Sequence, residues 1–267
     1  MVCKPHRRHP DRARLTSLVA ALPLLTLVGS AFAQLGAPET IERIKPSIVA
    51  VGSFGRLRSP QFSFSGTGFI VGDGLKVATN EHVVVKITSG DKGGALAIAI
   101  PRPGGTAQIR PARRLAADPT SDLALLGIDG PALPALRLAD AAQVREGEMY
   151  FITGFPIGAV LGLYPATHRA MIAAVSPIAI PAPRADTLDA RAVRQITGGA
   201  YSVFQLDASA YPGNSGSPVY HPESGAVIGI VNSVFVKSTR ESALTQPSGI
   251  TYAIPAAKLL KLLNQDR

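Results

Sequence analysis

The chain is poor in cysteine, tryptophan and charged residues. Of its 267 residues, Cys3 is the sole cysteine, none is tryptophan, and 17% are charged. One cysteine cannot form a disulfide within the chain, so the fold must be held by its hydrophobic core in any redox environment. Apolar residues make up 46% of the chain, which is enough for a sizeable core.

Acidic residues are also scarce, with 18 Asp and Glu against 27 Lys and Arg. Five of the basic residues lie before residue 15, and residues 34–267 carry 22 basic and 17 acidic side chains. The excess is mild and is spread along the chain. The one basic cluster, Arg110, Arg113 and Arg114, is better explained as a solvated strand end than as a nucleic-acid site. We therefore expect no nucleic-acid partner.

Long apolar runs are absent apart from residues 15–29. This run follows a basic start and precedes Ala31-Phe32-Ala33, an A-x-A cleavage pattern. It is short for a membrane span and contains Pro23. We predict a signal peptide over residues 1–33 and a mature chain over 34–267. The mature chain is then extracytoplasmic, periplasmic or secreted, without stable membrane insertion. An uncleaved N-terminal anchor is the alternative.

Glycine and proline are plentiful, with 26 and 22 residues, and they divide the chain into short segments. Short strands between such turns are typical of an all-β barrel or sandwich. Residues 130–145 read as a linker between two halves, and residues 177–200 as a surface excursion. Two short helices are expected, at 34–45 and 256–264. The expected strands are 47–54, two within 64–80, 95–100, 109–117, 123–128, 148–155, 168–175, 201–206, 219–221, 226–236 and 249–254.

Residues 212–218, Pro-Gly-Asn-Ser-Gly-Ser-Pro, place Ser215 between two glycines. Glycine can adopt backbone angles that other residues cannot, so a tight turn here would expose the Ser215 hydroxyl beside consecutive backbone N–H groups. Acyl transfer needs a nucleophile next to donors that stabilise the developing oxyanion. An ordinary turn between two strands is the alternative reading of these seven residues.

His82 and Asp122 complete the pattern upstream of Ser215. A serine hydroxyl needs an imidazole to accept its proton, and the imidazole needs a carboxylate to fix its tautomer. The chain order His, Asp, Ser suits a chymotrypsin-like arrangement. The order Ser, Asp, His of α/β-hydrolases is excluded, because the histidine after Ser215 is His221, with no aspartate between them.

Four strings in this order, at residues 66–71, 78–84, 121–126 and 212–218, resemble the protease domain of the Deg/HtrA serine peptidases. The segment 248–255 resembles the last strand of that domain. The resemblance covers about residues 40 to 262 and implies two six-stranded antiparallel β-barrels, at about 45–130 and 146–255, with a short C-terminal helix. The site would lie in the cleft between them. Only residues 256–267 follow the last strand, so we expect no PDZ domain.

The resemblance also implies roles for individual residues. Ser215 would attack the peptide carbonyl, His82 would transfer its proton, and Asp122 would orient His82. The backbone N–H groups of Gly213 and Ser215 would form the oxyanion hole. Asn214 stands where zymogen-type relatives carry Asp, so no activating second cleavage is expected.

Two further expectations concern the same motif and its surroundings. Ser217 replaces the second glycine of the family motif, which makes it the weakest match. By the family pattern, the substrate-binding pocket has Ser209 at its floor and Val234 and Gly249 on its sides, beside Asn232 and Ser233. Asp207 offers an alternative floor that would favour Lys or Arg.

The sequence thus predicts a serine endopeptidase that acts on polypeptides without a cofactor. No metal is expected, because His168 and His221 lack the spacing of a metal site. Two other functions stay open: a catalytically silent double barrel that binds peptides or misfolded chains, and a small-ester hydrolase. A homo-oligomer is also left open, because relatives often form trimers.

Overall fold

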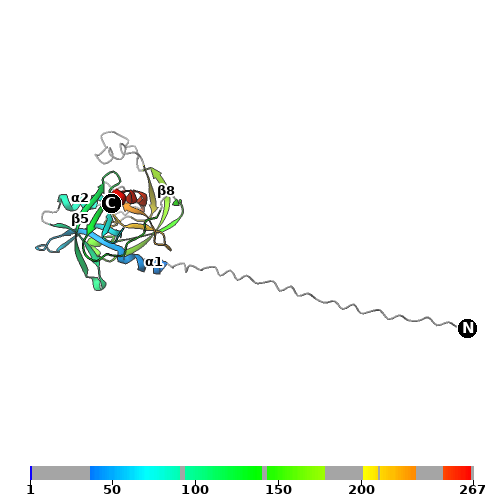
Figure 1. Cartoon of the computed structure of the whole chain (residues 1–267), viewed down its shortest axis with the longest axis horizontal. Coiled ribbons are helices and arrows are strands. Elements are labelled where there is room, and N and C mark those ends of the chain that lie inside the picture. The colour runs from blue at the N-terminus through cyan, green and yellow to red at the C-terminus, as the bar shows by residue number, and fades with distance from the viewer. Residues whose placement is uncertain are drawn as a thin grey trace. The chain divides into compact units, whose positions relative to one another are not determined.

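The structure is a computed structural model that describes residues 37–90, 94–139, 143–177, 201–209, 211–232 and 249–265, together with residue 1. The fold belongs to the compact unit Gln34–Arg267 (Figure 1). The predicted signal peptide, the excursion after residue 177 and Val234 lie outside the described residues. The described strands form two closed barrels of six strands each, which confirms the predicted fold class.

The first barrel has the strand order β1-β2-β3-β6-β5-β4. All of its neighbouring strands are antiparallel, as expected from short connections. The predicted hairpin is present, with Gly72 and Gly74 at positive φ between β2 and β3. The strands are β1 (Ile48–Phe54), β2 (Phe62–Val71), β3 (Lys76–Thr79), β4 (Ala95–Pro101), β5 (Ala107–Asp118) and β6 (Leu123–Ile128).

The second barrel has the order β10-β11-β12-β9-β8-β7 and is also antiparallel throughout. A chain segment that contains Leu136 and Leu138 leads from β6 to this barrel and pairs with it through a bridge from Leu138 to Val227. The strands are β7 (Met149–Gly154), β8 (Ala166–Pro177), β9 (Ser202–Asp207), β10 (Pro218–Tyr220), β11 (Val227–Asn232) and β12 (Ile250–Pro255).

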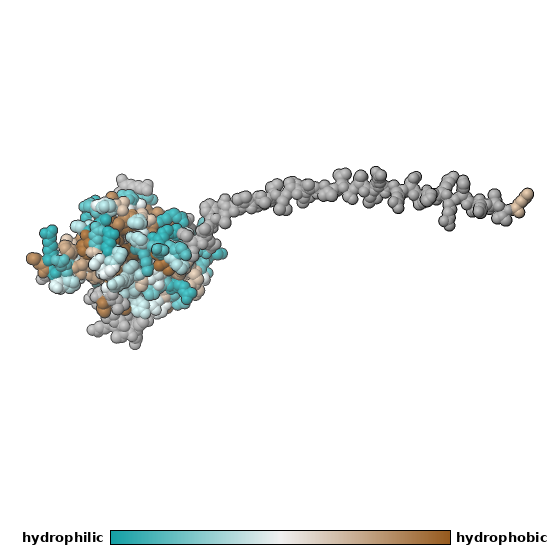
Figure 2. Space-filling model, turned by 90° about the horizontal axis from the view of Figure 1, so that it is seen from below, coloured by the Kyte–Doolittle hydropathy of each residue, from teal (hydrophilic) through white to brown (hydrophobic). Residues whose placement is uncertain are grey.

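Alternation along the strands divides the apolar side chains between two places. On β6, Ala124 and Leu126 join the interior of the first barrel, whereas Leu123 and Leu125 join a cluster that includes Phe155 of the second half. Successive side chains of a strand point to opposite faces, so one strand can supply both cores. This shared cluster packs the two barrels against each other. On the face drawn in Figure 2, hydrophilic and hydrophobic residues are interspersed.

Four α-helices accompany the barrels in the described part of the chain. Helix α1 (Ala37–Ile44) is tied to the turn after β10, because Thr40 Oγ1 donates to the carbonyl of Glu223 at 3.0 Å. Helix α6 (Ala256–Gln265) packs on β11 and β12 and also reaches β5 and β6 of the first barrel. Helix α3 (Gly158–Leu161) is a single turn after β7. Among the described residues, no helix is long and apolar enough to cross a membrane.

Helix α2 (Glu81–Gly90) was not predicted from the sequence, which indicated only a connection there. Its β-branched residues Val83, Val84, Val85, Ile87 and Thr88 have low intrinsic helix propensity. Three of these side chains, Val83, Val84 and Ile87, are buried in the first barrel's core. Tertiary packing therefore overrides local propensity, and it places His82 in the first turn of a helix.

We predict that Leu125→Ala lowers the free energy of unfolding by about 2–5 kcal/mol, because it opens a cavity in the shared cluster. Leu125 is fully buried. The matched control is Leu57→Ala at a fully exposed leucine, which should change stability by less than about 0.5 kcal/mol. Urea denaturation of both variants measures the difference. Equal losses would contradict the proposed packing.

Candidate functional site

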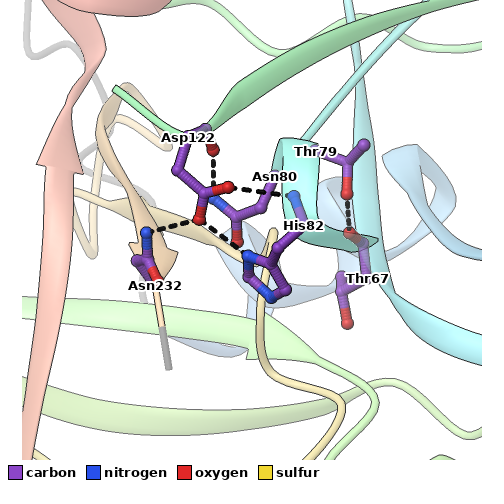
Figure 3. Close-up of polar contacts among 6 residues, drawn as sticks. All are labelled: Thr67, Thr79, Asn80, His82, Asp122 and Asn232. Atoms are coloured by element: carbon purple, nitrogen blue, oxygen red, sulfur yellow. Dashed lines mark hydrogen bonds and ion pairs between the residues drawn. The ribbon is translucent and has the colours of Figure 1, made fainter. Parts of the chain in front are cut away.

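His82 and Asp122 are joined by two hydrogen bonds. Asp122 Oδ2 lies 2.7 Å from His82 Nδ1, and Asp122 Oδ1 accepts the backbone N–H of His82 at 2.9 Å (Figure 3). The Asp122 side chain is 5% exposed and that of His82 is 19% exposed. A carboxylate only accepts hydrogen bonds, so His82 Nδ1 carries the hydrogen of this bond, which is the tautomer whose Nε2 can accept a proton.

Asp122 is held in an unusual backbone conformation between β5 and β6, with φ at 54°. Its carbonyl accepts the Asn80 side-chain amide at 3.1 Å and the Glu81 N–H at 3.2 Å. Aspartate tolerates the left-handed region better than most residues, and these bonds stabilise it there. The start of α2 is thereby attached to the Asp122 turn, which keeps the histidine and the carboxylate together.

Asn232, at the end of β11, donates from its side-chain amide to Asp122 Oδ2 at 2.8 Å (Figure 3). It is fully buried. The sequence pointed to Asn232 only as part of a pocket side, and nothing local in the sequence signalled its contact with Asp122, 110 residues away. This bond runs from the second barrel to the carboxylate of the first.

The Ser215 turn is folded as the two glycines of the motif predict. Gly213 has φ at 102° and Gly216 has φ at 88°, a region that L-residues rarely adopt. A Cβ at Gly213 would lie 2.3 Å from the Phe155 carbonyl oxygen, and one at Gly216 would lie 2.0 Å from that of Thr67. The turn is thus pressed between the end of β7 and strand β2, and Ser215 is 7% exposed.

Each carbonyl group from residue 211 to residue 215 accepts a hydrogen bond. Thr67 supplies two of these bonds, from its N–H to the Ser215 carbonyl at 2.9 Å and from its Oγ1 to the Gly213 carbonyl at 2.7 Å, and the Ile157 N–H donates to the Pro212 carbonyl at 2.8 Å. Within the turn, the Asn214 N–H donates to the Tyr211 carbonyl at 3.1 Å and the Ser217 N–H to the Asn214 carbonyl at 3.0 Å.

Fewer of the backbone N–H groups of the turn take part in hydrogen bonds. Gly216 donates to the Val231 carbonyl at 3.0 Å, and Asn214 and Ser217 donate within the turn. Within the described part of the chain, the N–H groups of Gly213 and Ser215 donate to no partner. They are the two groups that the sequence had assigned to an oxyanion hole. Two unengaged donors beside a serine hydroxyl can stabilise the negative charge that develops on the substrate's carbonyl oxygen when the hydroxyl attacks the carbonyl carbon.

The Ser215 turn and the start of α2 meet at Gly66 of β2. A Cβ at Gly66 would lie 2.8 Å from Val83 Cγ2 and 3.1 Å from the Ser215 carbonyl oxygen. Val83 directly follows His82, so the serine and the histidine approach from opposite barrels. No hydrogen bond links Ser215 Oγ to His82 Nε2 among the described residues. Such bonds are often long in the absence of substrate and tighten in the complex.

The expected pocket residues lie at the ends of adjacent strands. Ser209 follows β9 and Gly249 precedes β12, and both are exposed. The two strands are joined beside them, because Thr251 Oγ1 donates to the Ala208 carbonyl at 2.6 Å. Asp207 is exposed and pairs with Ile250 of β12. Val234 lies outside the described residues, so the assignment of the pocket stays a prediction.

The other titratable groups near the site are structural. Burial lowers the pKa of His168, whose ring packs 6.4 Å from that of Tyr211, just before the Ser215 turn. His168 is therefore neutral near pH 7. Burial also raises the pKa of Tyr220, whose hydroxyl lies 2.7 Å from Thr153 Oγ1. The described ranges contain no group of three or more His, Cys, Asp or Glu that could hold a metal ion.

Comparison with known proteins identifies relatives of this chain. The chain is similar to two proteins named probable periplasmic serine endoprotease DegP-like. That of Hahella chejuensis is 30% identical over 211 residues, which are 79% of this chain and 37% of the relative. That of Ectopseudomonas mendocina is 29% identical over 201 residues, which are 75% of this chain and 34% of the relative. The chain thus spans about a third of the length of these relatives.

Solved structures share the fold. An HtrA-type protease AlgW with a tripeptide is 24% identical and aligns with a TM-score of 0.59, over 86% of this chain and 63% of that chain. A serine endoprotease from Yersinia pestis is 23% identical with a TM-score of 0.60, over 87% of this chain and 66% of that chain. The profile of the trypsin-like peptidase domain matches residues 66–230, more than half of the chain. The chain therefore belongs to the trypsin-like peptidase domain family.

Proposed function

We propose that this chain is a serine endopeptidase that hydrolyses peptide bonds of polypeptides through His82, Asp122 and Ser215. The observation that carries the proposal is the double hydrogen bond between Asp122 and His82, on the other side of Gly66 from a serine turn whose Gly213 and Ser215 N–H groups are unengaged among the described residues. The bond to the backbone N–H fixes the position of the histidine relative to the carboxylate, and the bond to Nδ1 fixes the tautomer of its ring, and a general base needs both. The DegP-like relatives, which are named serine endoproteases, support the same function.

The reaction begins when Ser215 Oγ attacks the substrate carbonyl carbon and His82 Nε2 accepts the hydroxyl proton. Asp122 stabilises the imidazolium that forms and remains ionised. The carbonyl oxygen becomes an oxyanion, which accepts hydrogen bonds from the N–H groups of Gly213 and Ser215. His82 then donates its proton to the leaving amine, and the acyl group stays on Ser215. A water molecule, deprotonated by His82, hydrolyses the acyl-enzyme and releases Ser215. No cofactor takes part.

We also propose an extracytoplasmic location, with residues 1–33 as a signal peptide. The support is the basic start, the apolar run and the Ala31-Phe32-Ala33 pattern, together with the periplasmic relatives. The Asn214 side chain carries no charge and cannot form an ion pair with a new N-terminal ammonium group. We therefore expect that no second cleavage is needed to activate the enzyme.

We predict that Ser215→Ala and His82→Ala each lower kcat for a peptide substrate by several orders of magnitude, with the fold unchanged. The matched control is Ser217→Ala. Its Oγ is buried two residues away and has no hydrogen-bond partner among the described residues, so kcat should stay near wild type. A fluorophosphonate probe should label wild type and Ser217→Ala but not Ser215→Ala. Equal cleavage by wild type and Ser215→Ala would refute the proposal. A folded wild-type chain that neither hydrolyses the peptide nor takes up the probe at Ser215 would favour a peptide-binding role.

A second prediction concerns Asn232. Asn232→Leu removes a donor to the Asp122 carboxylate, and a hydrogen bond to a charged group is worth about 1.5–3 kcal/mol. We expect kcat to fall about ten- to a hundredfold with KM little changed, because the pair His82–Asp122 loses orientation rather than substrate contacts. Thr153→Val is the control, since Thr153 is equally buried in the second barrel and bonds to Thr167 and Tyr220 rather than to Asp122. A loss of kcat in Thr153→Val as large as that in Asn232→Leu would count against this role.

The third prediction concerns side-chain preference. A pocket formed by Ser209, Val234 and Gly249 is narrow and neutral, so we expect cleavage after Val, Ala or Leu. One methylene discriminates by only about 10- to 200-fold in such a pocket, so the preference is graded. A peptide-library cleavage profile measures it. Dominant cleavage after Arg or Lys, abolished in Asp207→Asn, would instead make Asp207 the specificity residue.

The last prediction of this section concerns processing. Protein recovered from the extracytoplasmic fraction should begin at or near Gln34 and be active without further cleavage. N-terminal sequencing of the active protein tests both points. Active protein that retains Met1 would show that the segment is kept as an anchor. An inactive chain that gains activity after a second N-terminal cut would contradict the inference from Asn214.

A further inference from the structure

Thr67 of β2 contacts the Ser215 turn with both its backbone and its side chain. Its N–H donates to the Ser215 carbonyl at 2.9 Å, and its Oγ1 donates to the Gly213 carbonyl at 2.7 Å. The same Oγ1 accepts the Phe155 N–H at 3.1 Å. Thr67 is fully buried and belongs to the first barrel, whereas Phe155 and the Ser215 turn belong to the second half. One residue therefore makes three hydrogen bonds across the interface.

The direction of each of these bonds is determined. A hydroxyl has one hydrogen and can also accept. The Phe155 N–H can only donate and the Gly213 carbonyl can only accept, so the Thr67 hydrogen goes to Gly213. The Thr67 carbonyl is engaged as well, because it accepts from Thr79 Oγ1 at 2.8 Å (Figure 3). This leaves Thr67 with no alternative arrangement within the site.

These bonds determine the orientation of the peptide planes around the nucleophile. A peptide group is planar, so a bond to its carbonyl oxygen sets the direction of the whole plane. Thr67 holds the plane after Gly213, which carries the Asn214 N–H, and the plane after Ser215, which carries the Gly216 N–H. The plane that carries the Ser215 N–H lies between these two. The plane between Pro212 and Gly213 is held by Ile157 N–H on the Pro212 carbonyl, at 2.8 Å. Ile157 lies two residues after Phe155, whose N–H donates to the Thr67 hydroxyl. Thr67 therefore supports this plane indirectly, through the segment from Phe155 to Ile157.

The space around the hydroxyl is shaped for this contact. A Cβ at Gly154 would lie 3.0 Å from Thr67 Oγ1 and 1.9 Å from Ser217 Oγ. Only glycine lets the β7 backbone approach both hydroxyl groups this closely. The Ser217 hydroxyl, at the position where the motif departs from the family's glycine, forms no bond with the described residues, so it does not compete for the Gly213 carbonyl.

We propose that the Thr67 hydroxyl is a positioning group for the oxyanion hole. From across the barrel interface, it holds the peptide planes next to those that carry the Gly213 and Ser215 N–H groups, so that the hole takes its shape only when the two barrels are docked. This inference rests on the proposed serine endopeptidase function. Thr67 touches neither substrate nor Ser215 Oγ, and it acts through the backbone of the turn.

The test compares Thr67→Val, which keeps the shape and removes the hydroxyl, with Thr67→Ser, which keeps the hydroxyl. Thr153→Val is the matched control, because Thr153 is equally buried and bonds to Thr167 and Tyr220 rather than to the turn. Each protein is assayed for kcat and KM on a fluorogenic peptide, for the Kd of a peptide aldehyde, and for inhibition by the product peptide. The aldehyde adduct on Ser215 places an oxygen in the oxyanion hole. The product peptide used is the amine product, which ends in an ammonium group and has no oxygen to place there.

We expect Thr67→Val to lower kcat about ten- to a hundredfold, less than the roughly 100- to 1,000-fold loss caused by removing a hole donor outright. Aldehyde affinity should fall in parallel, while KM and product inhibition change less than about threefold. Thr67→Ser should stay within about threefold of wild type in every readout. Thr153→Val should lower the melting temperature but leave kcat near wild type. If Thr67→Val does not fold, Thr67→Ala carries the same expectation.

Three results would overturn the inference. One is wild-type kcat and aldehyde affinity in Thr67→Val. Another is a kcat loss shared by Thr67→Val and Thr153→Val in proportion to their melting temperatures. The third is a Thr67→Ser variant as impaired as Thr67→Val. Failure of the proposed function looks different, because wild type would then neither hydrolyse the peptide nor bind the aldehyde more tightly than Ser215→Ala does, and both proposals would fall together.

Discussion

The docking of the two barrels is the constraint on which the rest of the structure depends. His82 and Asp122 come from the first barrel, and Ser215 comes from the second. Two sets of hydrogen bonds cross the interface at this point: Asn232 to the Asp122 carboxylate, and Thr67 to the Ser215 turn. The polar groups of the site are therefore also part of the contact between the barrels, and a shift of one barrel would disturb both the carboxylate and the turn.

The apolar core makes this docking rigid. Strands β1 and β6 place alternate side chains inside the first barrel and in the cluster shared with the second. Because one strand serves both cores, a movement between the barrels would also disturb the interior of the first. Helix α6 adds to the same effect, since it packs on β11 and β12 and reaches β5 and β6. Close packing of this kind limits the positions available to the Ser215 turn and to α2.

Buried hydrogen-bond donors and acceptors are rarely left unpaired in proteins, which makes the Ser215 turn informative. Every carbonyl from residue 211 to 215 has a donor, whereas the Gly213 and Ser215 N–H groups have no acceptor among the described residues. Gly213 is half-buried and Ser215 is buried, and an unpaired donor that is buried from water costs free energy in the folded protein. The cost is offset if these groups bind a negative oxygen of the substrate, which is the role that we propose for them.

The sequence by itself determined the all-β class, the approximate limits of most strands, and the pairing of His82 with Asp122. These follow from local information, because turn residues and alternating apolar residues define short strands, and the order of the motifs narrows the chemistry. The role of Ser215 as the nucleophile and the pocket of Ser209, Val234 and Gly249 stay predictions. Helix α2 was missed, since its β-branched residues disfavour a helix and only packing against the first barrel stabilises it.

Only the tertiary structure decided which distant residues support the site. Asn232 meets Asp122 over 110 residues of sequence, and Thr67 meets Gly213 over 146. Neither residue type is unusual in a strand, and neither position carries a local signal of its partner. Such contacts depend on strand register and on how the closed barrels dock, which are set by the packing of the whole chain. A hydrogen bond tolerates an error of only a few tenths of an ångström, far less than a motif in the sequence can specify.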